Sequence, residues 1–389
     1  MTSVEGSWNR REIAGAFADL GVLVPIAVAL IVTNGLSPTA VLLPAGLLYL
    51  AASAIYRLPV PVQPLKAFGA IAIAKGLGVD VIASGAVLMG VIFLTLGATG
   101  LIDLVAKAFP KPLIRGVQLT VGLLFLKIAY NLVMDTPPAF LDHKTPATWL
   151  IGLTLGCVVL ALALRRQPVA LALVGVAVVA IALRADLLAW GPSAIRLSHI
   201  DGGTLATAFA VLVIPQVPLT FANSCLATAD AARTYFGDAA SRVRPGRLAM
   251  SLGVANLLAA AVSGMPICHG AGGMTAHRAF GARTWRAPAL IGATLVVLAL
   301  GVGAGLATLL GAFPIPILAG LLAVAGLLHI ALLRDLTKPA HWAIALAIGV
   351  VGFLTNLAFA LGAGLIVWWV AVFVSRRRSP TDTAVTVDA

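Results

Sequence analysis

Apolar segments of membrane length follow one another along almost the whole chain. Of its 389 residues, 60% are hydrophobic and 10% are charged, whereas a soluble globular protein typically carries about 25% charged residues. The chain is therefore expected to be an all-α polytopic membrane protein, because a helix satisfies its own backbone hydrogen bonds in lipid. The net charge of +12 does not indicate nucleic acid as a partner, since lysine and arginine gather in the cytoplasmic loops of membrane proteins.

The apolar segments form two sets of seven, and the third member of each set is shorter than the ~20 residues that a span needs. The first set covers 14–32, 39–56, 65–76, 80–98, 112–131, 147–164 and 168–184. The second set covers 204–225, 246–263, 269–278, 286–309, 314–330, 340–355 and 357–374. Residues 99–111 are predicted to form an amphipathic surface helix, and 375–389 a cytoplasmic tail. Neither a cleavable signal peptide nor a soluble domain after the last span is expected.

The first short segment follows the stretch R-L-P-V-P-V-Q-P-L-K at residues 57–66. Proline fixes φ and removes a donor, so residues 58–64 are predicted to be extended, with a helix of about three turns from Leu65 to Gly76. Non-helical backbone at membrane depth is tolerated only where protein or a watery cavity covers it. The N-terminus of this half-helix, with Lys66 beside it, is expected to face a negatively charged ligand.

The second short segment, S-G-M-P-I-C-H-G-A-G-G-M at residues 263–274, repeats this design. Here too an extended lead-in with a proline, Pro266, precedes a short helix, and glycines at its start let backbone or ligand approach closely. Paired interrupted segments in two halves are typical of inverted-repeat transporters, whose site lies between them. An odd number of spans in each half makes the two repeats antiparallel.

The distribution of basic residues supports fourteen segments with both termini in the cytoplasm. With this topology most of the 26 lysines and arginines fall on the cytoplasmic side. Only Lys75, Lys144, Arg184 and Arg196 fall outside, while Lys66 and Lys127 lie within segments. A wrong span count would have removed this asymmetry.

Few ionisable or amide groups lie within the predicted spans, and each is a candidate for function. Asp19 is the one carboxylate inside the opening helix of the first repeat, where it either relays protons or holds Lys66 and backbone. The opening helix of the second repeat carries P-Q-V-P-L-T-F-A-N-S, and its two prolines are expected to break it near mid-membrane. Gln216 and Asn223 there, together with Gln63, are predicted ligand contacts or interhelical hydrogen-bonding groups.

An enzyme or a metal site is not indicated. Cys268 and His269 are adjacent, so on a helix they would point about 100° apart, and no third group orients the histidine. His277 lies two turns further on, which does not suit a shared metal ion. The three cysteines give no disulfide framework, and no cofactor is expected.

The stretches P-V-P-V-Q-P-L-K, P-Q-V-P-L-T-F-A-N-S and P-I-C-H-G-A-G-G, with the later F-G-A-R, resemble signature stretches of the molybdate transporters that are distantly related to sulfate permeases. The likeness extends from the opening G-A-F-A-D-L-G to the last spans. It implies a seven-plus-seven inverted repeat, with repeats at 12–184 and 204–374. A core domain (12–109 and 204–309) would work against a gate domain (112–184 and 314–374) by alternating access.

By this resemblance the oxyanion sits between the N-termini of the two half-helices. The predicted binding residues are Gln63, Lys66, Ala67, Gln216, Asn223, His269, Gly270, Ala271 and Gly272, with Asp19 as the proton-coupling group. The expected location is a bacterial-type inner membrane, surrounded by lipid, and a homodimer is a further expectation. Molybdate is chosen by resemblance alone, because sulfate is also a tetrahedral dianion. The alternatives are a sulfate or other oxyanion transporter, a nucleobase permease and an anion channel.

Overall fold

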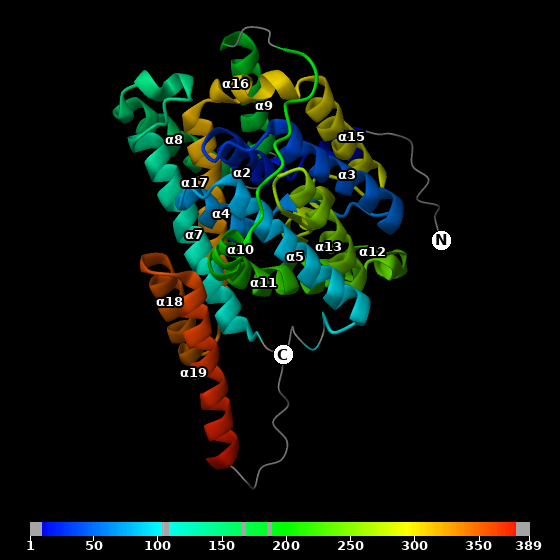
Figure 1. Ribbon diagram of the computed structural model, residues 1–389, viewed down its shortest axis with the longest axis vertical. Coiled ribbons are helices and arrows are strands. Elements are labelled where there is room, and N and C mark those ends of the chain that lie inside the picture. Colours follow the sequence, from blue (N-terminus) through cyan, green and yellow to red (C-terminus); the bar gives the residue numbers. More distant parts are fainter. Residues whose placement is uncertain (1–9, 103, 105–108, 165–168, 185–188, 379–389) are drawn as a thin grey trace.

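The computed structural model describes residues 10–102, 104, 109–164, 169–184 and 189–378, and these are mostly helical (Figure 1). The first half contains α1 Arg10–Ala16, α2 Leu20–Val32, α3 Pro38–Tyr56, β1 Gln63–Pro64, α4 Lys66–Ala74, α5 Val79–Thr99, α7 Lys111–Met134, the 3₁₀ turn η1 Leu141–Lys144, α8 Ala147–Ala163 and α9 Val169–Arg184.

The second half opens with one long, locally modified helix: α10 Gly202–Ala208, η2 Phe209–Val213, α11 Ile214–Leu219, η3 Thr220–Ala227 and α12 Thr228–Phe236. The elements η4 Gly237–Arg242, α13 Pro245–Ala261, β2 Ile267–Cys268, α14 Ala271–Ala279, α15 Arg286–Gly301 and α16 Gly303–Gly311 follow. The chain then forms α17 Ile315–Ala331, η5 Leu332–Asp335, α18 Pro339–Leu354 and α19 Leu357–Arg378.

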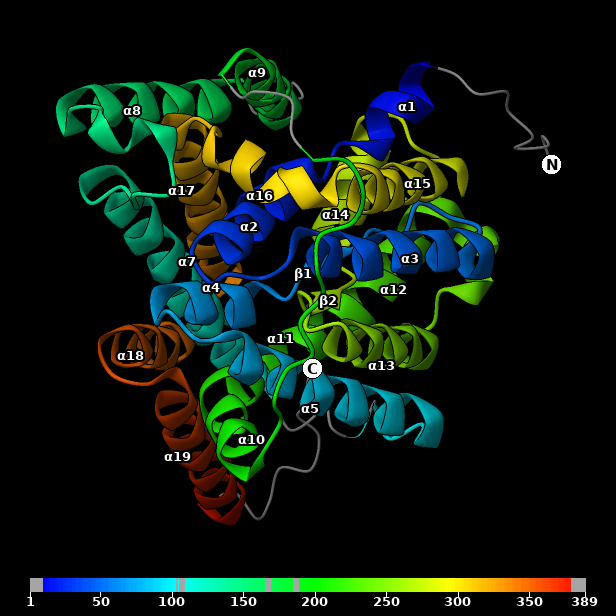
Figure 2. The same cartoon turned by 45° about the horizontal axis from the view of Figure 1, so that its top comes forward.

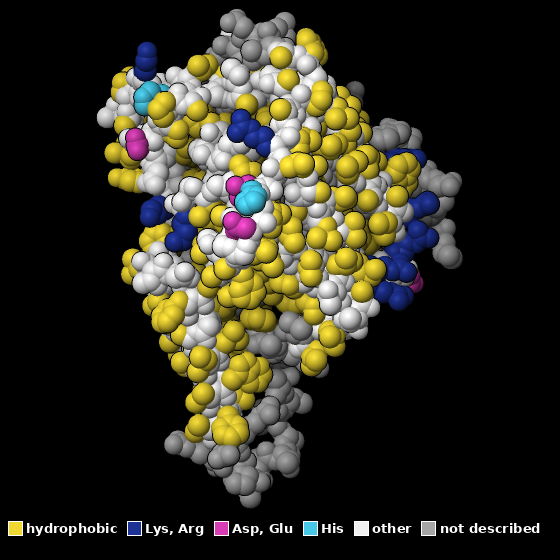
Figure 3. Space-filling view, viewed as in Figure 1, with side chains coloured by type: hydrophobic (Ala, Val, Ile, Leu, Met, Phe, Trp, Pro, Cys, Tyr) yellow, Lys and Arg dark blue, Asp and Glu magenta, His cyan; other side chains and the backbone are white. Residues whose placement is uncertain are grey.

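Six helices in the described part of the chain are long and apolar enough to cross a membrane, and a seventh span results if the bent pair α15 and α16 counts as one. Four shorter apolar helices accompany them: α2, α8, α18 and residues 171–183 of α9. Hydrophobic side chains cover most of the visible described surface (Figure 3), and α19 exposes large ones such as Ile366, at 67%. An apolar surface of this kind suits contact with lipid.

Two groups of helices pack side by side (Figures 1 and 2). In one group α3 lies along α15 and α5 along α13; in the other, α7 packs against α17 and α18, and α8 against α17. Glycines bring helices of each group into close contact. A Cβ on Gly122 of α7 would lie 2.7 Å from the carbonyl oxygen of Gly326 on α17, and the reverse holds. Small residues at such crossings are the usual means of packing helices in membranes.

Both half-helices form as predicted, with nine residues each in α4 and α14. Their extended lead-ins pair as a short antiparallel sheet, in which Gln63 lies opposite Cys268 and Pro64 opposite Ile267. The pair lies deep in the fold between the helices (Figure 2). No helix forms over residues 58–64, as predicted, but the strand is limited to Gln63 and Pro64: residue 58 lies in a bend, and the Val60 N–H donates to the Leu58 carbonyl oxygen at 2.8 Å.

Two predicted helices differ in detail, and a third lies partly outside the described residues. Residues 14–32 do not form one helix, because a turn at Phe17, Ala18 and Asp19 separates α1 from α2. Asp19 thus stands at the N-terminus of α2 and not inside a helix. The predicted segment 286–309 is bent by 96° between α15 and α16. Of the predicted surface helix at 99–111, residues 103 and 105–108 lie outside the described residues.

The prolines of the second repeat's opening helix do not break it, contrary to expectation. The chain stays helical from Gly202 to Arg242, with π-helical turns at η2 and η3 on either side of Pro215 and Pro218. A π-turn shifts the hydrogen-bonding register and so accommodates local irregularity without ending the helix.

The loops assigned to opposite sides of the membrane lie at opposite ends of α3, α5, α13 and α15. At one end, the Tyr56 hydroxyl donates to the carbonyl oxygen of Arg247 at 3.0 Å. At the other end, the hydroxyl groups of Ser198 and Ser263 lie 2.7 Å apart. The arginine-rich start of α13 belongs to the first of these ends, which is the predicted cytoplasmic one.

Candidate functional site

The half-helices α4 and α14 begin at the paired strands, so their N-termini lie close together in the interior. The backbone N–H of Leu65 donates to the carbonyl oxygen of Pro266 at 3.1 Å. From α13, the Asn256 amide donates to the carbonyl oxygen of Ile267 at 2.9 Å and accepts from the Ile267 N–H at 3.0 Å. The strand backbone is thus satisfied without further strands, as a buried backbone requires.

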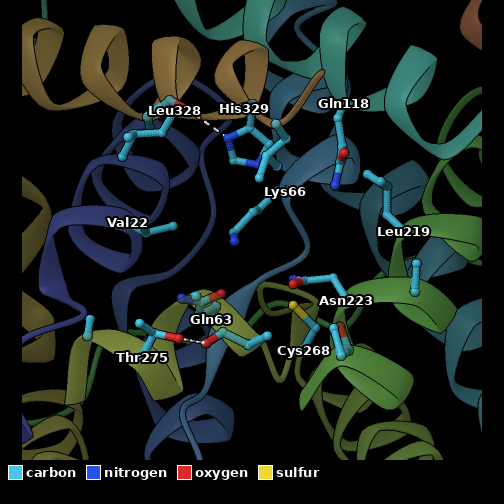
Figure 4. A pocket seen from close by; sticks show the side chains of 18 of the residues that line it. Val22, Gln63, Lys66, Gln118, Leu219, Asn223, Cys268, Thr275, Leu328 and His329 are labelled. Atoms are coloured by element: carbon cyan, nitrogen blue, oxygen red, sulfur yellow. Dashed lines mark hydrogen bonds between the residues drawn. The ribbon is translucent and has the colours of Figure 1, made fainter. Parts of the chain in front are cut away.

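Beside these N-termini lies a cavity of about 1080 Å³. Figure 4 shows side chains from both helix groups around it. The polar and charged residues that line it are Asp19, Gln63, Lys66, Lys111, Arg115, Gln118, Gln216, Asn223, Ser224, Asp230, Thr275 and His329, together with Cys268. Apolar residues of α17, such as Leu321 and Leu328, form the opposite wall. The cavity can hold a hydrated ion.

Lys66, the first residue of α4, points into the cavity (Figure 4). Among the described residues its ammonium group has no hydrogen-bonding or ion-pair partner, although it is close enough to Asp19 for the two charges to interact. The positive end of the α4 dipole lies at the same place. A lysine that faces the cavity beside a helix N-terminus is a place where an anion can bind.

Backbone donors add to this positive character. In the described part of the chain no partner is found for the N–H groups of Lys66 and Ala67 in α4, or of Ala271, Gly272 and Gly273 in α14. These are first-turn groups, which have no acceptor within their own helix. Helix N-termini of this kind are ready anion-binding sites.

Asp19 and Gln63 form a buried pair at the α14 N-terminus. The Gln63 amide nitrogen lies 2.6 Å from both carboxylate oxygens of Asp19 and donates to them. A Cβ on Gly273 would lie 2.6 Å from Asp19 Oδ2, so this glycine lets the carboxylate approach the helix. Gln63 Oε1 is buried without a partner among the described atoms. The pair gives the site a titratable acceptor beside its many donors.

Gln216 caps the first half-helix. Its side-chain oxygen accepts from the backbone N–H of Phe68 at 2.9 Å, and its amide nitrogen donates to the Thr220 hydroxyl at 3.0 Å. Gln216 borders the cavity, but both ends of its amide are occupied within the protein. It shapes the site by fixing α4, because it satisfies one of the N–H groups that a helix start leaves open.

The remaining predicted residues divide into two groups. Asn223, Ala271 and Gly272 line the cavity, whereas Ala67, His269 and Gly270 do not appear in its lining. His269 is fully buried, with Nδ1 2.8 Å from the Pro61 carbonyl oxygen and Nε2 2.9 Å from Ser251 Oγ. Both ring nitrogens are thus at hydrogen-bonding distance from groups of the protein, and the binding role of His269 stays a prediction from the sequence.

Several residues of α7 and α17 were not anticipated. His329 projects into the cavity from α17 (Figure 4), and Arg115, which lines the same cavity, donates hydrogen bonds to Gln118 and Asp335. Lys111 joins the same carboxylate at 3.0 Å. An ionisable residue within an apolar run, as in G-L-L-H-I-A, is the signal that could have identified His329.

Among the residues that the structure describes, no three side chains of the metal-ligating types come together. The site instead combines two helix starts, one lysine and several amides. Such a set can bind an anion by charge and hydrogen bonds.

Comparisons with known proteins agree with this chemistry. Residues 11–125 and 208–328 match the family described as "Molybdate transporter of MFS superfamily". Molybdate transporter 1 of Arabidopsis thaliana is 28% identical over 91% of this chain and 86% of its own length. Molybdate transporter 1 of Chlamydomonas reinhardtii is 29% identical over 87% of this chain and 86% of its own.

Solved structures of anion transporters have the same fold. The transmembrane domain of a cyanobacterium bicarbonate transporter, BicA, matches with a TM-score of 0.67 at 16% identity, over 90% of this chain and 97% of that one. Murine Slc26a9, an anion transporter in the inward-facing state, matches with a TM-score of 0.69 at 14% identity, over 95% of this chain and 69% of that one.

Proposed function

This chain belongs to the molybdate transporter family, and from that premise we propose that it carries molybdate across a membrane, with the anion bound between the N-termini of α4 and α14. The observation that carries this proposal is the meeting of two helix starts and the unpaired Lys66 at one cavity. A tetrahedral dianion accepts hydrogen bonds at all four oxygens, so it suits unpaired N–H groups from two directions.

We further propose that the chain is an inverted repeat of seven plus seven segments. The packing between halves supports this, because each main contact has a counterpart when the halves are exchanged. The pair α3–α15 corresponds to α5–α13, α7–α18 to α8–α17, and α1–α15 to α5–α10. The pairs α7–α17 and β1–β2 stay the same when the halves are exchanged, because the two members of each pair are counterparts of one another. The two groups of helices then serve as core and gate domains.

One contact departs from this correspondence, and it suggests how transport proceeds. In the first half α4 packs against α7, but in the second half the cavity separates α14 from α17, with Gly272 on one wall and Ala325 on the other. Closing α14 onto α17 while α4 leaves α7 would open the site to the other side. Alternating access of this kind follows from rigid movement of one helix group against the other.

The open side is proposed to be the cytoplasmic one. Lys111, Arg115 and Asp230 line the cavity, and in the positive-inside topology all three lie on the cytoplasmic side. On this basis the structure is inward-open, with both termini inside. The bacterial-type inner membrane and the homodimer stay predictions from the sequence.

Asp19 is proposed as the coupling group. Its carboxylate lies beside Lys66 and the α14 N-terminus, where a dianion would also bind. Two negative groups close together in a site of limited hydration repel each other, so protonating Asp19 would favour anion entry. Transport would then be proton-linked.

Uptake of labelled molybdate into proteoliposomes that contain the purified protein tests the proposed function. Wild-type vesicles should accumulate molybdate, and unlabelled tungstate or molybdate should compete, whereas uracil should not. Lys66→Ala should abolish uptake. Lys127→Ala is the matched control, because Lys127 lies over the Phe353 ring and does not line the cavity. Wild-type vesicles that take up no more molybdate than empty ones would exclude the proposal.

A further inference from the structure

His329 is the histidine that reaches the cavity from α17, on the wall opposite α14. Its ring points toward Lys66 (Figure 4), near enough for the charge of the lysine to act on the imidazole. The ring is held edge-on to Phe125 of α7, with centroids 5.7 Å apart. The position of the imidazole is therefore fixed by its own helix group and not by the half-helices.

One hydrogen bond of His329 determines its neutral tautomer, that is, which ring nitrogen carries the proton and which carries the free lone pair. Nδ1 lies 2.8 Å from the carbonyl oxygen of Ala325, and because a carbonyl oxygen only accepts, Nδ1 carries the proton. Among the described residues no hydrogen bond is found for Nε2. In the neutral imidazole Nε2 is thus an acceptor, and it would repel an oxygen of a fully deprotonated oxyanion.

We propose that His329 forms the gate-side contact of the bound oxyanion, and that one proton enters the site with the anion and is shared between Nε2 and an anion oxygen. This inference rests on the proposed function, since it requires an oxyanion beside Lys66. The charge balance supports it. A dianion faces one positive charge at Lys66, with the Asp19 carboxylate nearby, and a protonated His329 supplies a second positive charge and a donor.

Other charged or titratable groups also surround this helix. Those on elements that pack on α17 or line the same cavity include Asp19, Lys66, Lys111, Arg115, Lys127, Tyr130, Cys157, Asp230, Cys268, Arg334 and Asp335. Lys111 and Arg115 are paired with Asp335, and Lys127 is directed to Phe353. Of the cavity-lining side chains on α17 itself, His329 is the titratable one.

Because His329 lies on α17, its proton is expected to affect anion binding in one conformation only. If the two helix groups move against each other, the anion held at α4 and α14 leaves His329, and the shared proton is released. The proton shared with His329 would then strengthen anion binding only in the conformation that the structure shows. Since the protonated form binds, affinity should fall by about tenfold per pH unit above the pKa of the unliganded imidazole.

Calorimetric titration of the purified protein with molybdate, in two buffers with different ionisation enthalpies, counts the protons taken up per anion. Wild type should take up protons above neutral pH, and His329→Gln should take up about one fewer. His199→Gln is the matched control, because His199 is exposed outside the cavity, with 84% of its side chain accessible. Undiminished proton uptake in His329→Gln would overturn the proposal.

A second variant covers the case in which His329→Gln does not bind at all. His329→Lys carries a fixed charge, so it should bind molybdate with one proton fewer and a flatter pH profile than wild type. Failure of both variants to bind, with unchanged melting temperatures, would also contradict the proposal. A wild-type protein that shows no molybdate binding would instead refute the proposed function itself.

Discussion

The approach of Asp19 to the α14 helix depends on Gly273, and this can be tested with one methyl group. In Gly273→Ala the new Cβ would lie 2.6 Å from Asp19 Oδ2, 2.8 Å from Gln63 Nε2 and 2.8 Å from Pro61 Cβ. All three distances are shorter than normal van der Waals contact. The Asp19–Gln63 pair must therefore move away from the helix, or the helix from the pair.

The expected cost follows from these contacts. Loss of a buried hydrogen bond to a charged group costs about 1.5–3 kcal/mol, and crowding in a packed interior adds roughly 1–3 kcal/mol. Replacing glycine by alanine within a helix stabilises the helix by up to about 1 kcal/mol, which offsets part of this cost. The net destabilisation is then on the order of 2 kcal/mol or more, and molybdate affinity should fall as the pair shifts.

The adjacent glycine is a matched control. A Cβ on Gly272 meets no described atom within 4 Å, so Gly272→Ala gains helix propensity without crowding and should melt at or above the wild-type temperature. Thermal unfolding of the detergent-purified variants, followed by tryptophan fluorescence, gives the ranking. Gly273→Ala as stable as Gly272→Ala, with unaltered affinity, would refute the close packing of Asp19 on α14.

Three further predictions concern the cavity. Asp19→Asn should remove the Asp19 contribution to the pH dependence of uptake while anion exchange continues; a wild-type pH profile would exclude Asp19 as the coupling group. Gln216→Leu leaves the Phe68 N–H without its acceptor, so the melting temperature should drop by the equivalent of about 1–3 kcal/mol; an unchanged melting curve would contradict the capping role. Cys268 lines the cavity, so a small thiol reagent should inhibit uptake, molybdate should protect, and Cys268→Ser should be insensitive; equal inhibition of that variant would place the reactive thiol elsewhere.

The half-helices could be predicted because their cause is local. Prolines at positions 59, 61 and 64 exclude helix from the first lead-in, Pro266 lies in the second, and the small residues that follow allow helix again. The predicted spans elsewhere rest on length and apolar character, which are also local properties. Hence most helices begin and end within a few residues of the expected positions.

The departures have non-local causes. The turn at Asp19 is accompanied by a bond to Gln63, 44 residues away along the chain. The bend after Gly301 is accompanied by two backbone bonds with Gly191, which lies in a stretch that the sequence marks only as a polar gap. No periodicity within 14–32 or 286–309 reports such partners.

The same distinction applies to the site. Lys66, Gln63 and Gly272 were predictable as cavity residues because they lie at or next to the starts of recognisable half-helices. His269 occupies a similar position in sequence, but the Pro61 carbonyl oxygen and Ser251 engage its ring. His329 belongs to α17, and the orientation of α17 toward α4 depends on how the two helix groups pack. That packing could not be predicted from the sequence.

The location of the anion tests the proposed site most directly. A structure of the protein with tungstate, which scatters X-rays anomalously and has the shape of molybdate, should show one strong anomalous peak between the N-termini of α4 and α14. The peak should lie within hydrogen-bonding distance of Lys66 Nζ, and it should disappear in Lys66→Ala crystals. A peak confined to another part of the protein, or one that persists unchanged without Lys66, would contradict the proposed site.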